Sequence, residues 1–170
     1  MSNLLFVCTA NICRSPAAEA IARSRFGSGS HLFASAGFLY EDREATPEMV
    51  KMLSTIGVDA SSHTSAIITQ DRGLSADLIL TMESRHVQDI GLMSPELLER
   101  CLPLAEAAER LKFQRCSVSN FVSQLAGRDP LSYLDQKWDV ADPYKRSKRH
   151  YKKAVQEISE LVDTVVGALD

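Results

Sequence analysis

The sequence has few cysteines, no long apolar run and little net charge. Four cysteines in 170 residues are too few for a scaffold held by disulfides, and a bond between Cys8 and Cys13 would close only a short loop. No apolar run approaches the length that crosses a bilayer. No basic segment precedes the first apolar run, as it would in a signal peptide. We therefore expect a cytoplasmic protein without membrane insertion.

The charge balance also excludes some partners. The chain carries 19 Lys and Arg against 22 Asp and Glu, a net charge of −3, which is too mild to indicate nucleic acid or a membrane surface. Its 45% hydrophobic and 24% charged residues are typical of a globular protein. Because no repeat or linker divides the chain, we expect a single domain over residues 1–170.

The apolar pattern alternates between short buried strands and helices. Strands are predicted at residues 4–8, 32–36, 77–82 and 101–104, the last at a sheet edge because of Pro103. Helices are predicted at residues 17–26 and 46–56 and from 147 to the end. Residues 105–125 are expected to be helical with breaks. Ser15 and Thr46 each precede a proline and are expected to cap the first two helices. We expect the final helix to pack on the sheet.

The segment 128–143 is a long loop with two Asp-Pro pairs, at Asp129 and Asp142. Loops of this length in compact domains are usually binding elements or disordered. Tyr133 and Trp138 argue against disorder. We therefore expect an ordered lid or rim.

The residues with a chemical signature follow the first strand. Cys8 and Arg14 are separated by five residues and a hydroxyl comes next, in the run Cys8-Thr9-Ala10-Asn11-Ile12-Cys13-Arg14-Ser15. A loop between a strand end and a helix start can turn its N–H groups and the helix dipole toward an anion. Arg14 adds a two-pronged donor, and the positive field favours a thiolate at Cys8. The alternative is an inert core cysteine and a surface arginine, but the strand-to-helix position favours a phosphate cradle.

These residues, from Phe6 to Pro16, resemble the phosphate-binding loop of bacterial low-molecular-weight protein tyrosine phosphatases. Asp142-Pro143-Tyr144 resembles the general-acid motif of that family. Ser35-Ala36-Gly37, Ser62-His63 and the final helix extend the resemblance over nearly the whole chain. It implies an α/β fold of the phosphotyrosine phosphatase I type, a small doubly wound, mostly parallel four-stranded sheet with helices on both faces.

The resemblance also implies a mechanism. Cys8 attacks the phosphorus of a phosphotyrosine, and Asp142 protonates the leaving phenolate and then activates water. Ser15 stabilises the Cys8 sulfur, and neither a metal nor another cofactor takes part. The implied phosphate-binding residues are Thr9, Ala10, Asn11, Ile12, Cys13, Arg14 and Ser15. The implied partners are phosphotyrosine proteins or peptides, among them a bacterial tyrosine kinase.

Further residues acquire roles from the same resemblance. Asn11, which tolerates left-handed backbone geometry, would bond Ser35 and His63, although His63 has the alternative of an ordinary surface histidine. Cys13 would be the redox partner of Cys8, or only a packing residue. Tyr144 and Tyr40 are candidates for the walls that grip a phosphotyrosine ring. For the general acid, Tyr144 and the position before the last helix favour Asp142 over Asp129.

Some features depart from the family pattern or leave alternatives open. Ala10 stands where the family often has glycine, and Lys145 where some members have a second aromatic residue. A related arsenate reductase needs a close downstream cysteine pair, whereas Cys101 and Cys116 are 15 residues apart. A phosphoarginine phosphatase carries threonine at the position of Ile12. A phosphopeptide-binding module without turnover would require a damaged nucleophile or acid.

The basic run of residues 145–153 is by default a solvated helix face. Because it directly follows Asp142, a further hypothesis is that it borders the site and attracts acidic, multiply phosphorylated substrates.

Overall fold

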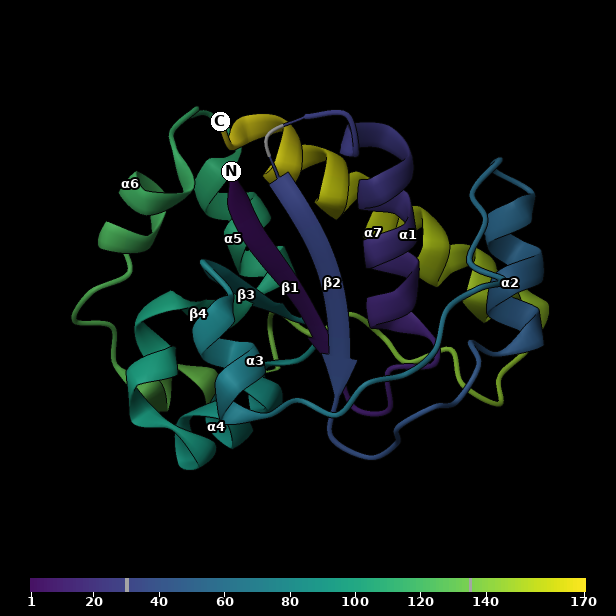
Figure 1. Cartoon of the computed structure of the whole chain (residues 1–170), viewed down its shortest axis with the longest axis horizontal. Helices are drawn as coiled ribbons and strands as arrows, with labels where there is room; N and C mark the ends of the chain where they lie inside the picture. The colour runs from purple at the N-terminus through teal and green to yellow at the C-terminus, as the bar shows by residue number, and fades with distance from the viewer. Residues whose placement is uncertain (30, 135) are drawn as a thin grey trace.

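The computed structural model describes residues 1–29, 31–134 and 136–170, and its centre is a four-stranded parallel sheet (Figure 1). The strands are β1 Ser2–Cys8, β2 His31–Gly37, β3 Leu78–Thr81 and β4 Cys101–Pro103. Their order is β2-β1-β3-β4, and every pair is parallel. The chain therefore changes direction across the sheet at β1, and the carboxyl end of β1 is a switch point where α/β folds bind ligands.

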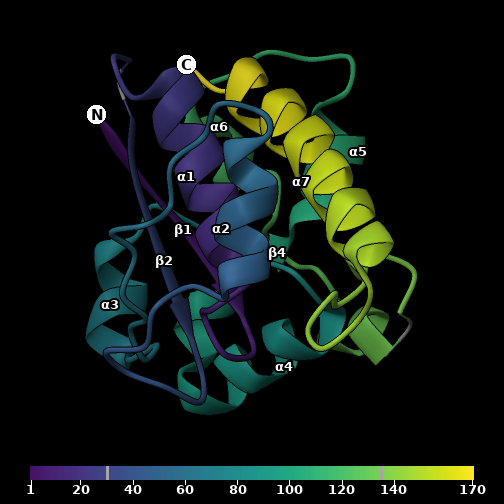
Figure 2. The ribbon, with the colours of Figure 1, turned by 90° about the vertical axis from the view of Figure 1, so that its right-hand side faces the viewer.

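The helices connect these strands and flank the sheet. They are α1 Arg14–Phe26, α2 Pro47–Ser54, α3 Gln70–Ser75, α4 Ser84–Met93, α5 Leu104–Leu111, α6 Val118–Ser123 and α7 Lys148–Ala168. Two 3₁₀ helices, η1 and η2, cover Pro95–Arg100 and Pro130–Leu134. In Figure 2, α1, α2 and α7 stand together on one side of the sheet, in agreement with the contacts of α7 with both other helices.

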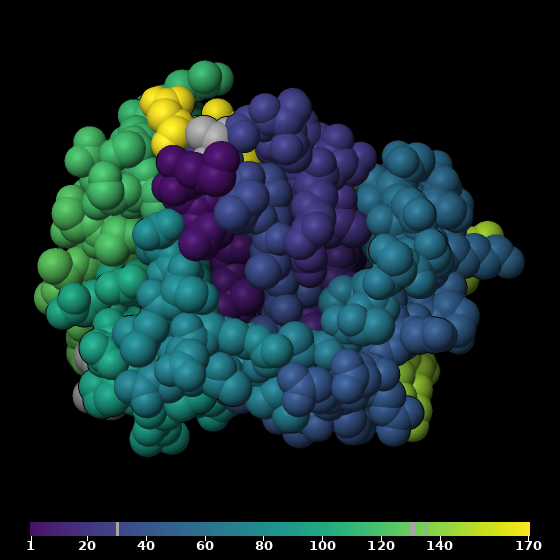
Figure 3. Space-filling model, in the orientation of Figure 1, coloured from purple at the N-terminus to yellow at the C-terminus, as the bar shows by residue number. Residues whose placement is uncertain are grey.

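The alternation of side chains along β1 divides the core between the two faces of the sheet. Leu4 and Phe6 join a cluster with residues of α1, α5 and α7, whereas Leu5 and Val7 join a second cluster with residues of α4 and η1. A strand buried on both faces needs this continuous apolar run. Figure 3 shows that the first strands nevertheless reach the surface, where Leu32 of β2 is 55% exposed.

The fold class and the βαβ pattern predicted from the sequence are confirmed, with corrections to single elements. α1 begins at Arg14, so Ser15 lies inside the helix and does not cap it. Thr46 is the residue before α2 but makes no capping bond with its side chain. The final helix is confirmed; it packs chiefly against α1 and α5, and its apolar side chains share one core cluster with Leu4 and Phe6 of the sheet. The loop 128–143 contains η2, which the sequence did not predict.

Three further helical segments were not predicted: α3, α4 and η1. The region 105–125 forms α5 and α6, in agreement with the breaks expected there. Within the described residues, every helix is too short or too polar to span a membrane.

Candidate active site

The loop from Cys8 to Arg14 joins the end of β1 to the start of α1, and neighbouring segments hold its backbone on both sides. The Phe38 N–H donates to the Thr9 carbonyl oxygen at 2.8 Å, and the Thr46 N–H donates to that of Ile12 at 2.8 Å. Asn11 has a φ of 53°, the left-handed geometry that this residue type tolerates. Ala10 does not have a positive φ, so the alanine at this position is compatible with the loop.

Gly37, at the end of β2, packs so closely against the backbone of this loop that only glycine fits at its position. A Cβ atom on Gly37 would lie 2.6 Å from the Asn11 nitrogen and 2.9 Å from the Ala10 carbonyl carbon. Both neighbours are backbone atoms, which cannot move without displacing the loop. Any larger residue at position 37 would therefore deform the cradle.

Cys8 is 3% exposed and its sulfur accepts two hydrogen bonds. The Asn11 N–H donates to Sγ at 3.3 Å and the Ser15 hydroxyl at 3.0 Å. Hydrogen bonds from such donors stabilise a negatively charged sulfur. The hydroxyl that the sequence predicted as a helix cap is thus directed at the candidate nucleophile.

Asn11 lies at the centre of a network that supports the loop. Its Nδ2 donates to the Ser15 hydroxyl at 2.9 Å and to the Ser35 hydroxyl at 2.8 Å. Its carbonyl oxygen lies 2.8 Å from His63 Nε2, and Ser35 donates to Glu19 at 2.6 Å. The structure brings together the asparagine, serine and histidine that the sequence analysis grouped, and it adds Glu19.

Arg14 is 1% exposed, and its guanidinium group contacts two carboxylates. Nη1 lies 2.5 Å from Glu83 Oε1 and donates to the Val140 carbonyl oxygen at 2.9 Å. Nη2 donates to Asp142 Oδ2 at 3.0 Å. The Nε atom is buried and has no hydrogen-bond partner among the described residues, so it remains able to donate to an anion in the loop.

Asp142 reaches Arg14 because the loop before it is tied to the end of β3. The Val140 N–H donates to the Met82 carbonyl oxygen at 2.8 Å, and the Ser84 N–H donates to Asp139 Oδ1 at 2.6 Å. Asp129, the alternative from the second Asp-Pro pair, instead precedes η2, where its carbonyl oxygen accepts a bond from Ser132.

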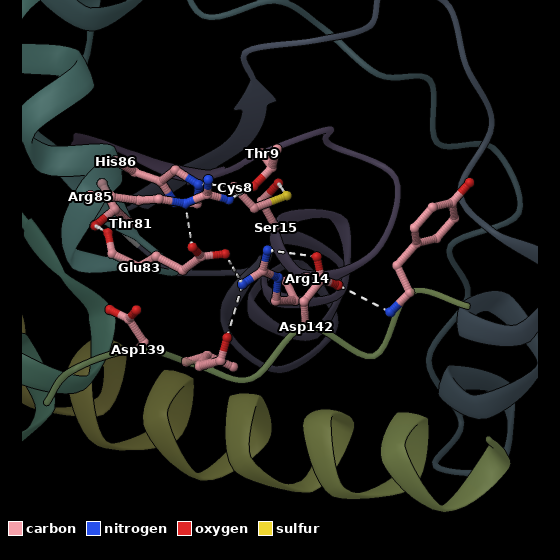
Figure 4. A network of polar contacts seen from close by, with 12 residues as sticks. Cys8, Thr9, Arg14, Ser15, Thr81, Glu83, Arg85, His86, Asp139 and Asp142 are labelled. Carbon is pink, nitrogen blue, oxygen red and sulfur yellow. Dashed lines mark hydrogen bonds and ion pairs between the residues drawn. The ribbon is translucent and has the colours of Figure 1, made fainter. Parts of the chain in front are cut away.

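The segment after β3 contributes residues that the sequence analysis missed (Figure 4). Burial favours the neutral form of Glu83, but the charge of Arg14 and the bond from Arg85 outweigh it, and the pKa of Glu83 lies below its ordinary value. Glu83 therefore stays ionised and balances Arg14. Its position just after a buried strand of a parallel sheet was the available signal.

Thr9 is held by two further residues of this segment. Arg85 Nη2 donates to the Thr9 hydroxyl at 2.9 Å, and His86 Nε2 lies 3.0 Å from the same oxygen. The His86 ring stacks on Phe38, and its pKa is lowered to about 4, chiefly by burial. At neutral pH the imidazole is thus uncharged, so its Nε2 can accept a hydrogen bond from the Thr9 hydroxyl, while Arg85 donates one to the Thr9 oxygen.

Cys13 differs from Cys8 in its surroundings. Its Sγ lies 3.2 Å from the Thr46 hydroxyl, and burial is the largest cause that raises its pKa to about 11. Cys13 is therefore a neutral thiol at physiological pH. Its part as a redox partner stays a prediction.

The two candidate pocket walls are both partly exposed. Tyr40 is 40% and Tyr144 is 45% exposed, and a cation lies over each ring, from Arg43 and from Lys145. The Tyr144 N–H donates to Asp142 Oδ1 at 3.0 Å, so the backbone of Tyr144 lies beside the candidate acid. Within the described part of the chain, no group of three His, Cys, Asp or Glu side chains is arranged to hold a metal ion.

Comparisons with known proteins agree over nearly the whole chain. Residues 3–170 match the model of the low molecular weight phosphotyrosine protein phosphatase family. The chain is 27% identical to the probable low molecular weight protein-tyrosine-phosphatase EpsP of Ralstonia nicotianae, over 98% of this chain and 94% of the relative. It is 29% identical to the protein-arginine-phosphatase of Bacillus subtilis, over 94% and 91% of the two chains.

A solved structure has the same fold. The low molecular weight protein tyrosine phosphatase from T. tengcongensis superposes with a TM-score of 0.77 at 29% identity, and the match covers 99% of this chain and 100% of that one.

Proposed function

This chain belongs to the low molecular weight phosphotyrosine protein phosphatase family and is a phosphatase, and from that premise we propose that it hydrolyses phosphotyrosine through a phosphocysteine at Cys8. The observation that carries the assignment is the buried Arg14, which lies between Glu83 and Asp142 at the mouth of the loop that begins with Cys8. A nucleophile, an anion-binding group and a proton donor are then available at one strand end.

In the first step, the Cys8 thiolate attacks phosphorus and the S–P bond forms as the P–O bond to the phenol breaks. The N–H groups of the loop and Arg14 hold the oxygens of the phosphoryl group while charge moves to the leaving oxygen. Ser15 and the Asn11 N–H donate hydrogen bonds to the attacking sulfur. The free Nε of Arg14 is the donor that an oxygen of the substrate would accept.

Asp142 supplies the proton for the leaving phenolate. It is ion-paired with Arg14 before substrate binds, and the phosphoryl dianion takes over the interaction with the guanidinium group. Asp142 then lies beside a negative group, which favours its protonated form. After the phenol leaves, the Asp142 carboxylate accepts a proton from water, the water oxygen bonds to phosphorus, and the S–P bond breaks to restore the Cys8 thiolate.

Ile12 and the two tyrosines support an aromatic leaving group. Ile12 is half-buried and packs against the apolar core at the edge of the loop, and Tyr40 and Tyr144 offer flat faces to a phenyl ring. The apolar side chain of Ile12 offers no hydrogen bond to a guanidinium leaving group, so it is the residue that favours a phenol over a phosphoarginine. The 29% identical arginine phosphatase nevertheless makes phosphoarginine the second candidate substrate.

A thiol relay of the arsenate reductase kind has little support in this arrangement. Cys101 lies in β4, fully buried, and burial raises the pKa of its thiol. Cys116 lies beside Leu169 at the end of α7. A relay requires thiols that reach the sulfur of Cys8 in turn, and these two are fixed in separate parts of the fold.

The natural substrates would be phosphotyrosine proteins or peptides, and a bacterial tyrosine kinase would be one of them. The four cysteines are free thiols, which suits a reducing compartment, and we place the protein in the cytoplasm.

The test is a substrate panel with the wild-type protein and Cys8→Ser, with and without a chelator. Wild type is expected to hydrolyse p-nitrophenyl phosphate and phosphotyrosine peptides in preference to phosphoserine and phosphoarginine peptides. Cys8→Ser should lose turnover and still bind phosphate. Wild-type turnover by Cys8→Ser would refute the mechanism, and preference for phosphoarginine or reduction of arsenate with a thiol would refute the substrate assignment.

A further inference from the structure

The start of α7 and the turn before it carry six Lys and Arg residues within positions 145–153. These cations, the α7 cationic surface, are all exposed: Lys145, Arg146, Lys148, Arg149, Lys152 and Lys153. Within residues 1–29, 31–134 and 136–170, none of them forms an ion pair with a carboxylate. Arg25 and Arg110 elsewhere on the surface do have acidic partners. Among the described residues, Lys112 and Arg115 are exposed without an ion pair as well, so what distinguishes the α7 cationic surface is that six such cations are gathered within nine residues.

The charges of α7 oppose the stability of the helix itself. Its first turn contains no acidic residue, so the cations face the positive end of the helix dipole. Lys148 and Lys152 are four residues apart, as are Arg149 and Lys153, and like charges at this spacing repel each other. Lys153 is also attracted by Glu157, four residues further on, which offsets one of these repulsions. Helix stability therefore does not account for the α7 cationic surface, which points to an anion outside the chain.

Lys145 adds a second unfavourable feature, a strained backbone conformation. It has a φ of 58° in the turn that the Arg146 N–H closes onto the Pro143 carbonyl oxygen at 2.9 Å. Glycine or asparagine fits this left-handed position with less strain. A long cation occupies it instead, with its Nζ 5.3 Å from the centre of the Tyr144 ring.

The α7 cationic surface is fixed close to the proposed active site. Tyr151, which lies among these cations in the sequence, is buried behind the loop from Cys8 to Arg14. Burial is the largest cause that raises the pKa of its hydroxyl to about 12, and the neighbouring Cys13 is the second. On the other side, Asp142 precedes Lys145 by only three residues. Figure 2 shows the loop before α7 folded back beside the loop between β1 and α1.

We propose that the α7 cationic surface binds acidic residues or further phosphate groups that flank the phosphotyrosine of a substrate. This inference rests on the proposed function and names the substrate class as acidic phosphotyrosine segments. In this proposal, a peptide with its phosphotyrosine at Cys8 runs past Tyr144, and its flanking residues lie toward Lys145 and the start of α7, which follow Asp142 directly in the chain. The apolar face of α7 is buried in the core, so the helix cannot insert into a lipid surface, and the net charge of −3 opposes binding of a long polyanion.

The experiment compares two double charge reversals with the same change in net charge. Lys148→Glu with Lys152→Glu alters the α7 cationic surface. Lys112→Glu with Arg115→Glu alters exposed cations near the opposite end of α7, where Cys116 bonds Ala168. Each protein is assayed with p-nitrophenyl phosphate, a phosphotyrosine peptide flanked by Asp and Glu, and its matched peptide flanked by Asn and Gln, at about 50 and about 300 mM salt.

Wild type is expected to prefer the acidic peptide at low salt, and the preference should decline at high salt. The α7 reversal should lower kcat/KM for the acidic peptide about tenfold, mainly through KM. It should leave p-nitrophenyl phosphate and the neutral peptide unchanged, with a Tm that is equal or higher because the helix dipole is better matched. The reversal at positions 112 and 115 should change none of these values.

Equal kcat/KM for the two peptides in wild type, or equal losses in both double variants, would overturn the proposal. Binding to phosphatidylserine vesicles or single-stranded DNA that is tighter than to the acidic peptide, and lost only in the α7 reversal, would also overturn it. If wild type hydrolyses neither peptide nor p-nitrophenyl phosphate, the proposed function itself fails. If it hydrolyses both peptides equally well, only the present inference fails.

Discussion

Arg14 contacts two carboxylates that differ in burial. The side chain of Glu83 is 14% exposed, whereas that of Asp142 is 47% exposed. The more buried Glu83 is also held by Arg85, and the pKa of Glu83 is lowered. Glu83 is thus suited to hold the arginine permanently, and Asp142 is suited to exchange with a substrate and return.

For Asp142→Ala, we expect slower turnover with a strong dependence on the leaving group. Without the proton donor, the phenolate must depart as an anion, so substrates with a high phenol pKa should lose about 100-fold or more in kcat and activated aryl phosphates much less. A series of substituted phenyl phosphates measures this dependence. An equal loss across the series would contradict the role of Asp142 as the acid.

For Glu83→Gln, we expect misplacement of Arg14 and a loss in kcat/KM of up to about 100-fold, since small displacements of a binding group cost this much. Glu41→Gln, which removes the exposed partner of Arg72, is the matched control and should have no effect. Steady-state assays with p-nitrophenyl phosphate distinguish the two variants. Unchanged kcat/KM in Glu83→Gln would show that Arg14 does not depend on this carboxylate.

At the scale of elements, the parts that sequence predicts best are those whose signal is local. β1, the turn after it and the start of α1 lie within 16 residues, and their apolar run, hydroxyl and proline are adjacent. The predicted cap at Ser15 was wrong because α1 begins one residue earlier, and the Ser15 hydroxyl donates to the Cys8 sulfur. Thr46 does hold the predicted N-cap position of α2, but its hydroxyl lies beside the Cys13 sulfur and not on a helix N–H. Propensity contains no information on such partners.

The parts that sequence did not predict depend on contacts between distant elements. Glu83 and His86 lie at the start of α4 and become part of the site only because β3 pairs with β1. Their spacing forms no motif, and the one available signal was the position of Glu83 just after a buried strand. The short helices α3 and η1 likewise lack a full apolar period, and η1 is stabilised by the burial of Leu97.

The junction between β2 and the catalytic loop gives a prediction at this scale. Gly37→Ala places a Cβ against backbone atoms of the loop, and we expect it to cost about 1–3 kcal/mol of stability and to lower activity. Gly167→Ala in α7 is the control, because a Cβ atom there meets no atom within 4 Å. This substitution should stabilise the helix slightly. Urea unfolding and p-nitrophenyl phosphate assays measure both effects. Normal activity in Gly37→Ala would mean that the loop adapts.

At the scale of the whole molecule, His86 links stability to pH. Its pKa is about 4 when folded, against an ordinary value of about 6.5. As the pH falls below 6.5, the unfolded chain binds a proton that the folded protein does not, so stability declines until the folded form also takes the proton near pH 4. The full difference amounts to about 3 kcal/mol.

We therefore expect the free energy of unfolding to decrease between pH 7.5 and about pH 5, and His86→Asn to show a smaller decrease. The charges that face His86 are Glu83, Arg14 and Arg85, and all three remain in the variant. His150→Asn, at an exposed position, is the control. Equal pH dependence in wild type and His86→Asn would contradict this account.

The bond from Arg14 Nη1 to the Val140 carbonyl oxygen joins residues 126 positions apart, and this distance has a consequence in time. While the chain emerges from a ribosome, the loop from Cys8 to Arg14 is made well before the segment around Val140 that completes its surroundings. Contacts of such long sequence separation form late in folding. We expect no phosphatase activity from a nascent chain until α7 has emerged, and recovery of activity during refolding should lag behind formation of the helices, which stopped-flow circular dichroism with parallel activity sampling would measure.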